Sequence, residues 1–209
     1  MWAKLVDGGI VIGADEAAGK AALAGLPERH MFLLTRTGES VVLHDCGEEA
    51  VVRQTPINVV SHAAPPIDLI SNFAATPFSL DGAAYASVEG FWQCWRYGDA
   101  AERARVAMLA GRAAKAAGAA TPPERFDYGG ASLRWGSWEH WQLMRRACQA
   151  KFAQNEDARA ALLGTLGRPL VHRTRRDSRS IPNVVMAQIW TEIREALAKE
   201  AGADAAAKP

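Results

Sequence analysis

The sequence contains few cysteines, and they are not arranged for a disulfide framework or a zinc site. The 209 residues include Cys46, Cys94 and Cys148, an odd number without a Cys-x-x-Cys pair. Disulfide frameworks and structural zinc sites need paired cysteines at short, regular spacings. The pattern excludes both classes of cysteine-rich domain and is typical of a protein of the reducing cytoplasm.

A long apolar segment is also absent. No stretch approaches the roughly 18 consecutive apolar residues that a membrane-spanning helix needs. The N-terminal segment "MWAKLVDGGIVIG" carries Lys4 and Asp7 where a signal peptide has an unbroken apolar core. We therefore expect a cytoplasmic protein without a membrane partner.

The charge is close to balanced. The net charge is +1 and the pI is about 7.8, while hydrophobic residues make up 49% and charged residues 22% of the chain. This composition is typical of a folded globular protein. Because there is no strong overall field, any contact with nucleic acid has to be local.

Several catalytic templates are missing as well. The glycines of "DGGIVIGADEAAG" do not have the spacing of a dinucleotide-binding fingerprint, and the chain has no P-loop and no nucleophile elbow. The histidines show no His-Glu-x-x-His or other close ligand spacing; they are His30, His44, His62, His140 and His172. We expect neither a metal site nor a cofactor, and carboxylate chemistry remains.

The first 54 residues predict a small αβ extension. Short strands are expected within residues 2–12 around a turn at Asp7, followed by a helix over 14–26 and a hairpin formed by 31–36 and 41–45. A strand at 56–60 and the proline-bearing loop "SHAAPPIDL" come next. We place the boundary of the extension near residue 54.

Residues 55–198 predict a mainly helical domain, followed by a flexible tail at 199–209. Helices are expected from Ser87 onward and over 99–118, 137–154, 156–166 and 183–200, with a loop through "TPPERFDYGG". Trp141, Met144, Cys148 and Phe152 recur at helical spacing and predict one core-facing stripe. Lys151 lies beside this stripe, so its ammonium either snorkels to solvent or points into a cleft.

One carboxylate, Glu89, lies in the aromatic-rich stretch "SNFAATPFSLDGAAYASVEGFWQCWR", residues 71–96. Ser87 is a good N-cap, so Glu89 is expected in the first helical turn, where the helix dipole favours its ionised form. Burial against the aromatic rings favours the neutral form. Trp92, Gln93 and Arg96 follow on the same helix face, which fits either a small polar site or an ordinary dipole complement.

A basic cluster, "HRTRRDSRS", covers residues 172–180. It contains Arg173, Arg175, Arg176 and Arg179 around the acid Asp177. Arginine forks suit phosphate groups, but a basic loop of this kind is also common on a solvated surface.

The stretch around Glu89 resembles the opening signature of the NADAR family: Ser-Asn-Phe, then Pro-Phe, Asp-Gly and a helix start Ser-x-Glu-x-x-x-Gln. The matching residues are Ser71, Asn72, Phe73, Pro77, Phe78, Asp81, Gly82, Ser87, Glu89 and Gln93. Further on, "KFAQN" at 151–155 matches the Lys-Phe-x-Gln-Asn segment of the family, and Asp177 falls on the aspartate of its acidic loop. The resemblance extends from about residue 57 to residue 198.

This resemblance implies an α+β fold, mostly helical with a few short strands, and hydrolysis of an N-glycosidic bond to a guanine-like base. It implies Glu89 and Asp177 as catalytic carboxylates, with Glu89 stabilising the charged sugar and acting on the attacking water. The implied substrate-binding residues are Ser71, Asn72, Phe73, Trp92, Gln93, Trp135, Lys151 and Arg176. Trp92 or Trp135 would stack on the base, and Arg176 or Lys151 would face a phosphate.

The chain also departs from the family pattern. "SRSIPN" follows Asp177 in place of the usual aromatic residue and Trp-Gly, and His172 stands where an acid is common. Val59 and Val60 replace an aromatic pair. "RWGSWEHW" aligns only with a gap, so the family tryptophan corresponds to Trp135 or Trp138, and we prefer Trp135.

The sequence therefore leaves three functions open. The first is removal of ADP-ribose from guanine in DNA or a nucleoside, with a possible DNA contact through the loop from Arg173 to Arg179. The second is hydrolysis of ribosylaminopyrimidine phosphates of riboflavin synthesis. The third is an inactive module that binds nucleotide sugars. The oligomeric state stays open.

Overall fold

The computed structural model describes residues 2–6, 9–13, 30–37, 40–48, 56–119, 121–175, 178 and 180–206, with side chains between residues 56 and 201 of these ranges. The chain divides into two compact units. One comprises residues 1–57 with 167–169, and the other comprises residues 58–166 with 170–209. Each unit is described below by itself.

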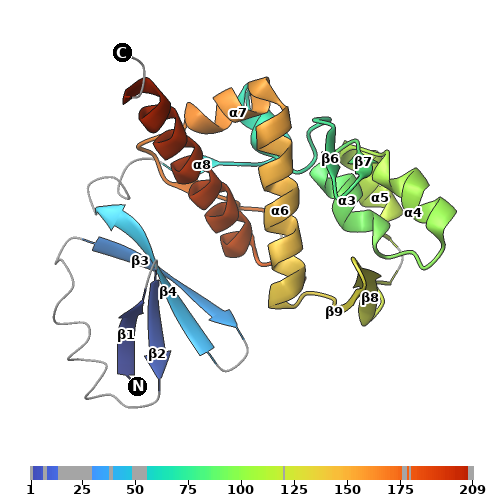
Figure 1. The fold of residues 1–209 in the computed structure, drawn as a ribbon, viewed down its shortest axis with the longest axis horizontal. Coiled ribbons are helices and arrows are strands. Elements are labelled where there is room, and N and C mark those ends of the chain that lie inside the picture. The colour runs from blue at the N-terminus through green and yellow to red at the C-terminus, as the bar shows by residue number, and fades with distance from the viewer. Residues whose placement is uncertain are drawn as a thin grey trace. The chain divides into compact units, whose positions relative to one another are not determined.

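The first unit contains a four-stranded antiparallel sheet (Figure 1). Its strands are β1 (Trp2–Val6), β2 (Gly9–Gly13), β3 (His30–Thr37) and β4 (Ser40–Glu48), in the order β1-β2-β4-β3. Pairing of Thr37 with Ser40 closes the predicted hairpin, whose β-branched residues favour extended backbone. The predicted helix at 14–26 and the predicted boundary near residue 54 lie outside the described residues, so both stay predictions.

The second unit is built around helix α6 (Trp138–Gln154), which contacts α3 (Val88–Cys94), α7 (Glu156–Leu163) and α8 (Asn183–Ala206). In Figure 1, α6 lies between α8 and the group formed by α3, α4 and α5. The predicted stripe is confirmed, because its four side chains are all buried. Ser137 caps the helix by accepting a hydrogen bond from the backbone N–H of His140.

Helix α3 begins where the sequence predicts. The hydroxyl of Ser87 accepts a hydrogen bond from the backbone N–H of Gly90 at 2.9 Å and donates one to the carbonyl of Leu109 at 2.8 Å. The backbone N–H of Glu89 donates to the carbonyl of Asn72 at 2.9 Å. The helix start is therefore tied to two other parts of the second unit, and every residue of α3 is buried.

The predicted helix over 99–118 is wrong, because two helices replace it: α4 (Ala100–Ala107) and α5 (Gly111–Ala117). Gly111, the first residue of α5, has a φ of 56°, which the interior of a right-handed α-helix does not allow and which glycine adopts most easily. At the break, the carbonyl of Leu109 accepts from Ser87, and the backbone N–H of Gly111 donates to the carbonyl of Phe73 at 3.0 Å. Alanine content predicts helix but does not reveal these tertiary partners.

The predicted loop through "TPPERFDYGG" is wrong over 125–128, which forms strand β8 (Arg125–Tyr128) of a hairpin with β9 (Ala131–Arg134). Gly129 and Gly130, with φ of 57° and 80°, supply the two positive-φ residues of a tight hairpin turn. A second hairpin pairs β6 (Phe78–Leu80) with β7 (Ala83–Tyr85), and the short strands β5 (Ile57–Asn58) and β10 (Leu170–Val171) also pair.

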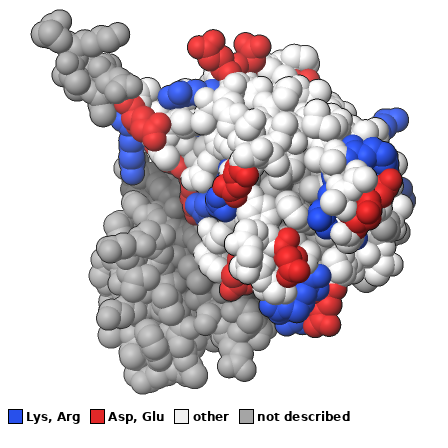
Figure 2. Space-filling view, turned by 45° about the vertical axis from the view of Figure 1, so that its right-hand side comes forward, with Lys and Arg blue, Asp and Glu red and all other residues white. Residues whose placement is uncertain are grey.

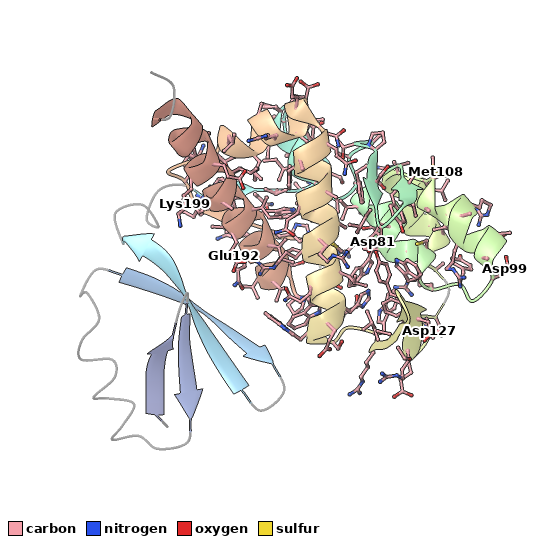
Figure 3. All side chains as sticks on the ribbon, in the orientation of Figure 1. Asp81, Asp99, Met108, Asp127, Glu192 and Lys199 are labelled. Carbon is pink, nitrogen blue, oxygen red and sulfur yellow. The ribbon has the colours of Figure 1, made fainter. Side chains whose placement is uncertain are left out.

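Asp81, at the turn between β6 and β7, connects this hairpin to its neighbours. Its carboxylate accepts hydrogen bonds from the hydroxyl of Tyr128 at 2.6 Å and from the guanidinium of Arg146 at 2.6 Å and 2.8 Å. Figure 3 labels Asp81 beside α6. The aspartate of the Asp-Gly motif thus has a structural role here, holding the turn against β8 and α6.

These elements confirm the predicted α+β class, with helices dominating the second unit and short strands between them. Within the ranges given above, no helix combines the length and the apolarity required to cross a bilayer. On the face drawn in Figure 2, basic and acidic side chains are interspersed, and no large area carries a single sign of charge.

Candidate functional site

A cavity of about 670 Å³ opens within the second unit. Its wall combines the segment Ser71–Phe73, Glu89 and Trp92 of α3, Lys115 of α5, and the segment 172–175. Such a volume falls within the usual range of small-molecule sites, about 300 to 1,000 Å³. Segments that are distant in the sequence therefore meet around Glu89.

Glu89 is nearly buried, with 6% of its surface exposed. Its Oε1 accepts a hydrogen bond from Nε2 of Gln93 at 2.7 Å and lies 3.6 Å from Nζ of Lys115. No hydrogen bond to the second oxygen, Oε2, occurs among the described residues. Glu89 also lines the cavity, so its carboxylate, which the protein holds through Oε1, forms part of the cavity wall.

Trp92 provides an aromatic wall of the cavity, which Phe73 also lines. Behind it, the imidazole of His140 stacks on Trp92 with 3.8 Å between ring centroids and 5° between planes. Trp135 lies 5.5 Å from Trp92 and 4.5 Å from His140 between centroids. Trp135 thus supports the wall from behind, whereas Trp138 is exposed.

The segment after β10 is held by side-chain contacts to its backbone. Asn58 accepts a hydrogen bond from the backbone N–H of Arg173 at 2.7 Å and donates one to its carbonyl at 3.3 Å. Thr174 accepts from the amide of Asn183 at 2.9 Å. Arg173 and Arg175 are exposed at this segment and line the cavity, so positive charge faces the site from here and from Lys115.

Comparison with known proteins identifies the family. The family model described as "Bacteriophage protein GP30.3" matches residues 66–192. N-glycosidase YbiA of Escherichia coli K12 is 32% identical over 130 residues, which are 61% of this chain and 76% of that protein. The chain belongs to the NADAR family. N-glycosidase YbiA of Shigella boydii has the same identity and coverage.

A solved structure supports the same NADAR assignment. The NMR structure of the E. coli protein YbiA matches with a TM-score of 0.51 and 28% identity, covering 70% of this chain and 86% of that chain. The predicted resemblance and the predicted fold class are therefore confirmed.

The NADAR motif residues fall into distinct groups. Five of the predicted site residues line the cavity: Ser71, Asn72, Phe73, Glu89 and Trp92. Gln93, Trp135 and Lys151 do not line it and contact the wall from behind. Arg176 and Asp177 lie outside the described residues, so their predicted roles in binding and catalysis stay predictions.

Lys151 is fully buried, so the interpretation that it snorkels to solvent is wrong. Its Nζ donates hydrogen bonds to the carbonyls of Ile70 at 3.1 Å and Ser71 at 2.8 Å. Burial lowers the pKa of Lys151 to about 7. In this geometry the ammonium holds the backbone that leads into the Ser71–Phe73 wall.

Sequence reasoning missed Lys115, His62 and Asn183, which also line the cavity. Lys115 is one of several cations in an alanine-rich stretch, and it lies near Glu89 on a helix that is separate from α4. No local pattern distinguishes it. Asn183 had a usable signal, since it begins the predicted helix close to the basic cluster.

His140 is buried in the neutral form. Its Nδ1 accepts a hydrogen bond from the backbone N–H of Gly136 at 3.0 Å, which places the proton on Nε2. Burial, together with the positive charge of Arg96, lowers the pKa of His140 to about 3. The stack on Trp92 therefore contains an uncharged imidazole throughout the neutral pH range.

This neutrality predicts a pH dependence of stability. Because the unfolded chain takes up a proton on His140 below about pH 6.5 and the folded chain does so only near pH 3, acid stabilises the unfolded state. Between pH 7 and about pH 4.5, the free energy of unfolding should therefore fall in both proteins. The wild type should lose roughly 2 kcal/mol more than His140→Phe loses. Urea unfolding at both pH values measures this difference. Equal losses in the two proteins would contradict it.

Proposed function

We propose that this chain is an N-glycosidase that releases ADP-ribose from ADP-ribosylated guanine, in DNA or in a nucleoside. Its similarity to N-glycosidase YbiA supports the N-glycosidase reaction. The observation that carries the proposal is the geometry of Glu89. A nearly buried carboxylate, held through one oxygen by Gln93, lines a cavity of suitable size beside the indole of Trp92.

Breaking an N-glycosidic bond develops positive charge at the anomeric carbon. The carboxylate of Glu89 stabilises this charge and accepts a proton from the attacking water. The water oxygen bonds to the anomeric carbon while the electron pair of the carbon–nitrogen bond leaves with the base. The base nitrogen takes a proton from solvent and Glu89 returns one, so that one water molecule is consumed. Trp92 supplies a stacking surface for the departing base.

The cations of the cavity favour a substrate with more than one phosphate. Lys115 comes from α5, whereas Arg173 and Arg175 come from the segment after β10. Guanidinium forks bind phosphate oxygens in pairs, and the ammonium adds a point charge. A pyrophosphate, as in ADP-ribose, can use both groups. In this proposal, DNA contacts the loop from Arg173 to Arg179.

Two features of the charge distribution favour the second candidate, hydrolysis of a ribosylaminopyrimidine phosphate. The face in Figure 2 carries interspersed charges, and the whole chain has a net charge of only +1. Neither feature is typical of a DNA-binding protein. A small phosphorylated substrate needs only the cations inside the cavity.

The test is a chromatographic assay of product release from three substrates: ADP-ribosylated guanosine, ADP-ribosylated DNA and the ribosylaminopyrimidine phosphate. We expect free ADP-ribose from one or both of the first two. Release of ribose phosphate alone would favour the second candidate. Tight ADP-ribose binding without turnover of any substrate would contradict the enzymatic proposal. With DNA, kcat/KM should fall steeply as salt rises, because phosphate contacts release counterions.

A further inference from the structure

A short chain of hydrogen bonds connects Arg96 to Glu89. Nε of Arg96 donates to Oε1 of Gln93 at 2.6 Å, and Nε2 of Gln93 donates to Oε1 of Glu89 at 2.7 Å. Gln93 is 2% exposed and Glu89 is 6% exposed, so water competes little for these bonds. These two hydrogen bonds connect Arg96, which follows α3, through Gln93 to the carboxylate of Glu89 at the cavity.

The guanidinium of Arg96 determines which groups donate and which accept in these two hydrogen bonds. A guanidinium carries only donors, so the group of Gln93 that faces Arg96 has to be its carbonyl oxygen. The amide nitrogen of Gln93 then faces Glu89, and an NH₂ group only donates. Arg96 thereby forces Glu89 Oε1 to act as an acceptor, which the ionised carboxylate does best.

The surroundings leave the amide of Gln93 little room for another position. A Cβ placed on Gly118 would lie 2.1 Å from Oε1 of Gln93, so the amide occupies the space that a side chain would take there. On the other side, the guanidinium of Arg96 lies 5.0 Å from the ring centroid of Trp135. Packing therefore holds the side chains of Gln93 and Arg96 in place.

We propose that Arg96 is a positioning residue for the reaction of Glu89: it acts through Gln93 to hold Oε1 of the carboxylate as a hydrogen-bond acceptor, so that the carboxylate keeps one orientation in the cavity. This inference rests on the proposed function. Other charged or titratable groups near Glu89 are Lys115 of α5 and, along the cavity wall, His62, His172, Arg173 and Arg175. None of these contacts Gln93 in the described hydrogen bonds.

The first experiment is a double-mutant cycle on kcat. Arg96→Met and Gln93→Met should each lower kcat about 10- to 100-fold, with little effect on KM. Each substitution removes a hydrogen bond between Arg96 and Glu89. Adding Arg96→Met to Gln93→Met should cost less than about twofold more. Arg96→Lys, which also only donates, should stay within about threefold of the wild type. Additive losses in the double variant would overturn the proposal.

A second measurement does not depend on turnover. The side-chain amide protons of Gln93, assigned in NMR spectra by their loss in Gln93→Met, should be protected from exchange in the wild type. Arg96→Met should remove this protection, and Arg96→Lys should keep it. If the wild type hydrolyses none of the substrates, the proposed function fails, but this measurement still decides the role of Arg96. Unchanged protection in Arg96→Met would overturn that role.

Discussion

Glu89→Gln is expected to lower kcat by about 10²- to 10⁴-fold, the usual contribution of a general base. The substitution conserves shape, and the new amide oxygen can still accept the hydrogen bond from Gln93 that Oε1 now accepts at 2.7 Å. It removes the negative charge that stabilises the sugar and the oxygen that takes the proton from water. Substrate binding depends on Trp92 and on the cations of the cavity, so the Kd should change only a few-fold. Single-turnover rates and calorimetric titration with the substrate measure both quantities.

A matched control is Glu156→Gln. Glu156 also lies in the first turn of a helix, α7, but it is exposed and outside the cavity. This variant should keep the wild-type kcat. Turnover by Glu89→Gln at the wild-type rate would exclude Glu89 as the catalytic carboxylate. If both substrate binding and turnover were lost, the charge of Glu89 would be needed for substrate binding as well.

The local structure at the centre of the candidate site was predictable because its sequence signals are local. Ser87 as N-cap, Glu89 in the first turn and Gln93 one turn later are fixed by helix geometry, and the structure contains both the cap and the bond from Gln93 to Glu89. The other side of the cavity depends on tertiary contacts. Lys115 reaches Glu89 across separate helices, and Arg173 is placed by Asn58, a residue 115 positions away along the chain. The spacing of residues along the sequence does not predict such contacts.

The same distinction applies to the fold. The long helix with its stripe from Trp141 to Phe152 was predicted because its period and its cap agree. The break between α4 and α5 was missed because it is stabilised from outside, by Ser87 and Phe73. The hairpin of β8 and β9 was missed because its strands are short. The Gly129-Gly130 pair was read as part of a loop although it also suits a hairpin turn.

Gly90→Ala should lower the free energy of unfolding by about 1 to 3 kcal/mol, against the usual expectation for a helical glycine. In an open helix the same change stabilises by roughly 1 kcal/mol, because alanine has the higher helix propensity. Here a Cβ would lie 2.4 Å from the carbonyl oxygen of Leu109 and 2.9 Å from that of Ala107. Both atoms are backbone atoms, one at the end of α4 and one in the break that follows it, so this backbone and α3 have to move apart.

The matched control is Gly98→Ala, because a Cβ at Gly98 would meet no atom within 4 Å. Its unfolding free energy should stay within about 0.5 kcal/mol of the wild type. Urea unfolding of both variants measures the difference. Activity adds a second readout: a shift of α3 against Leu109 also moves the Ser87 cap and Glu89, so kcat of Gly90→Ala should fall even at temperatures where the variant stays folded. A Gly90→Ala variant that is as stable and active as Gly98→Ala would show that α3 does not need this close approach.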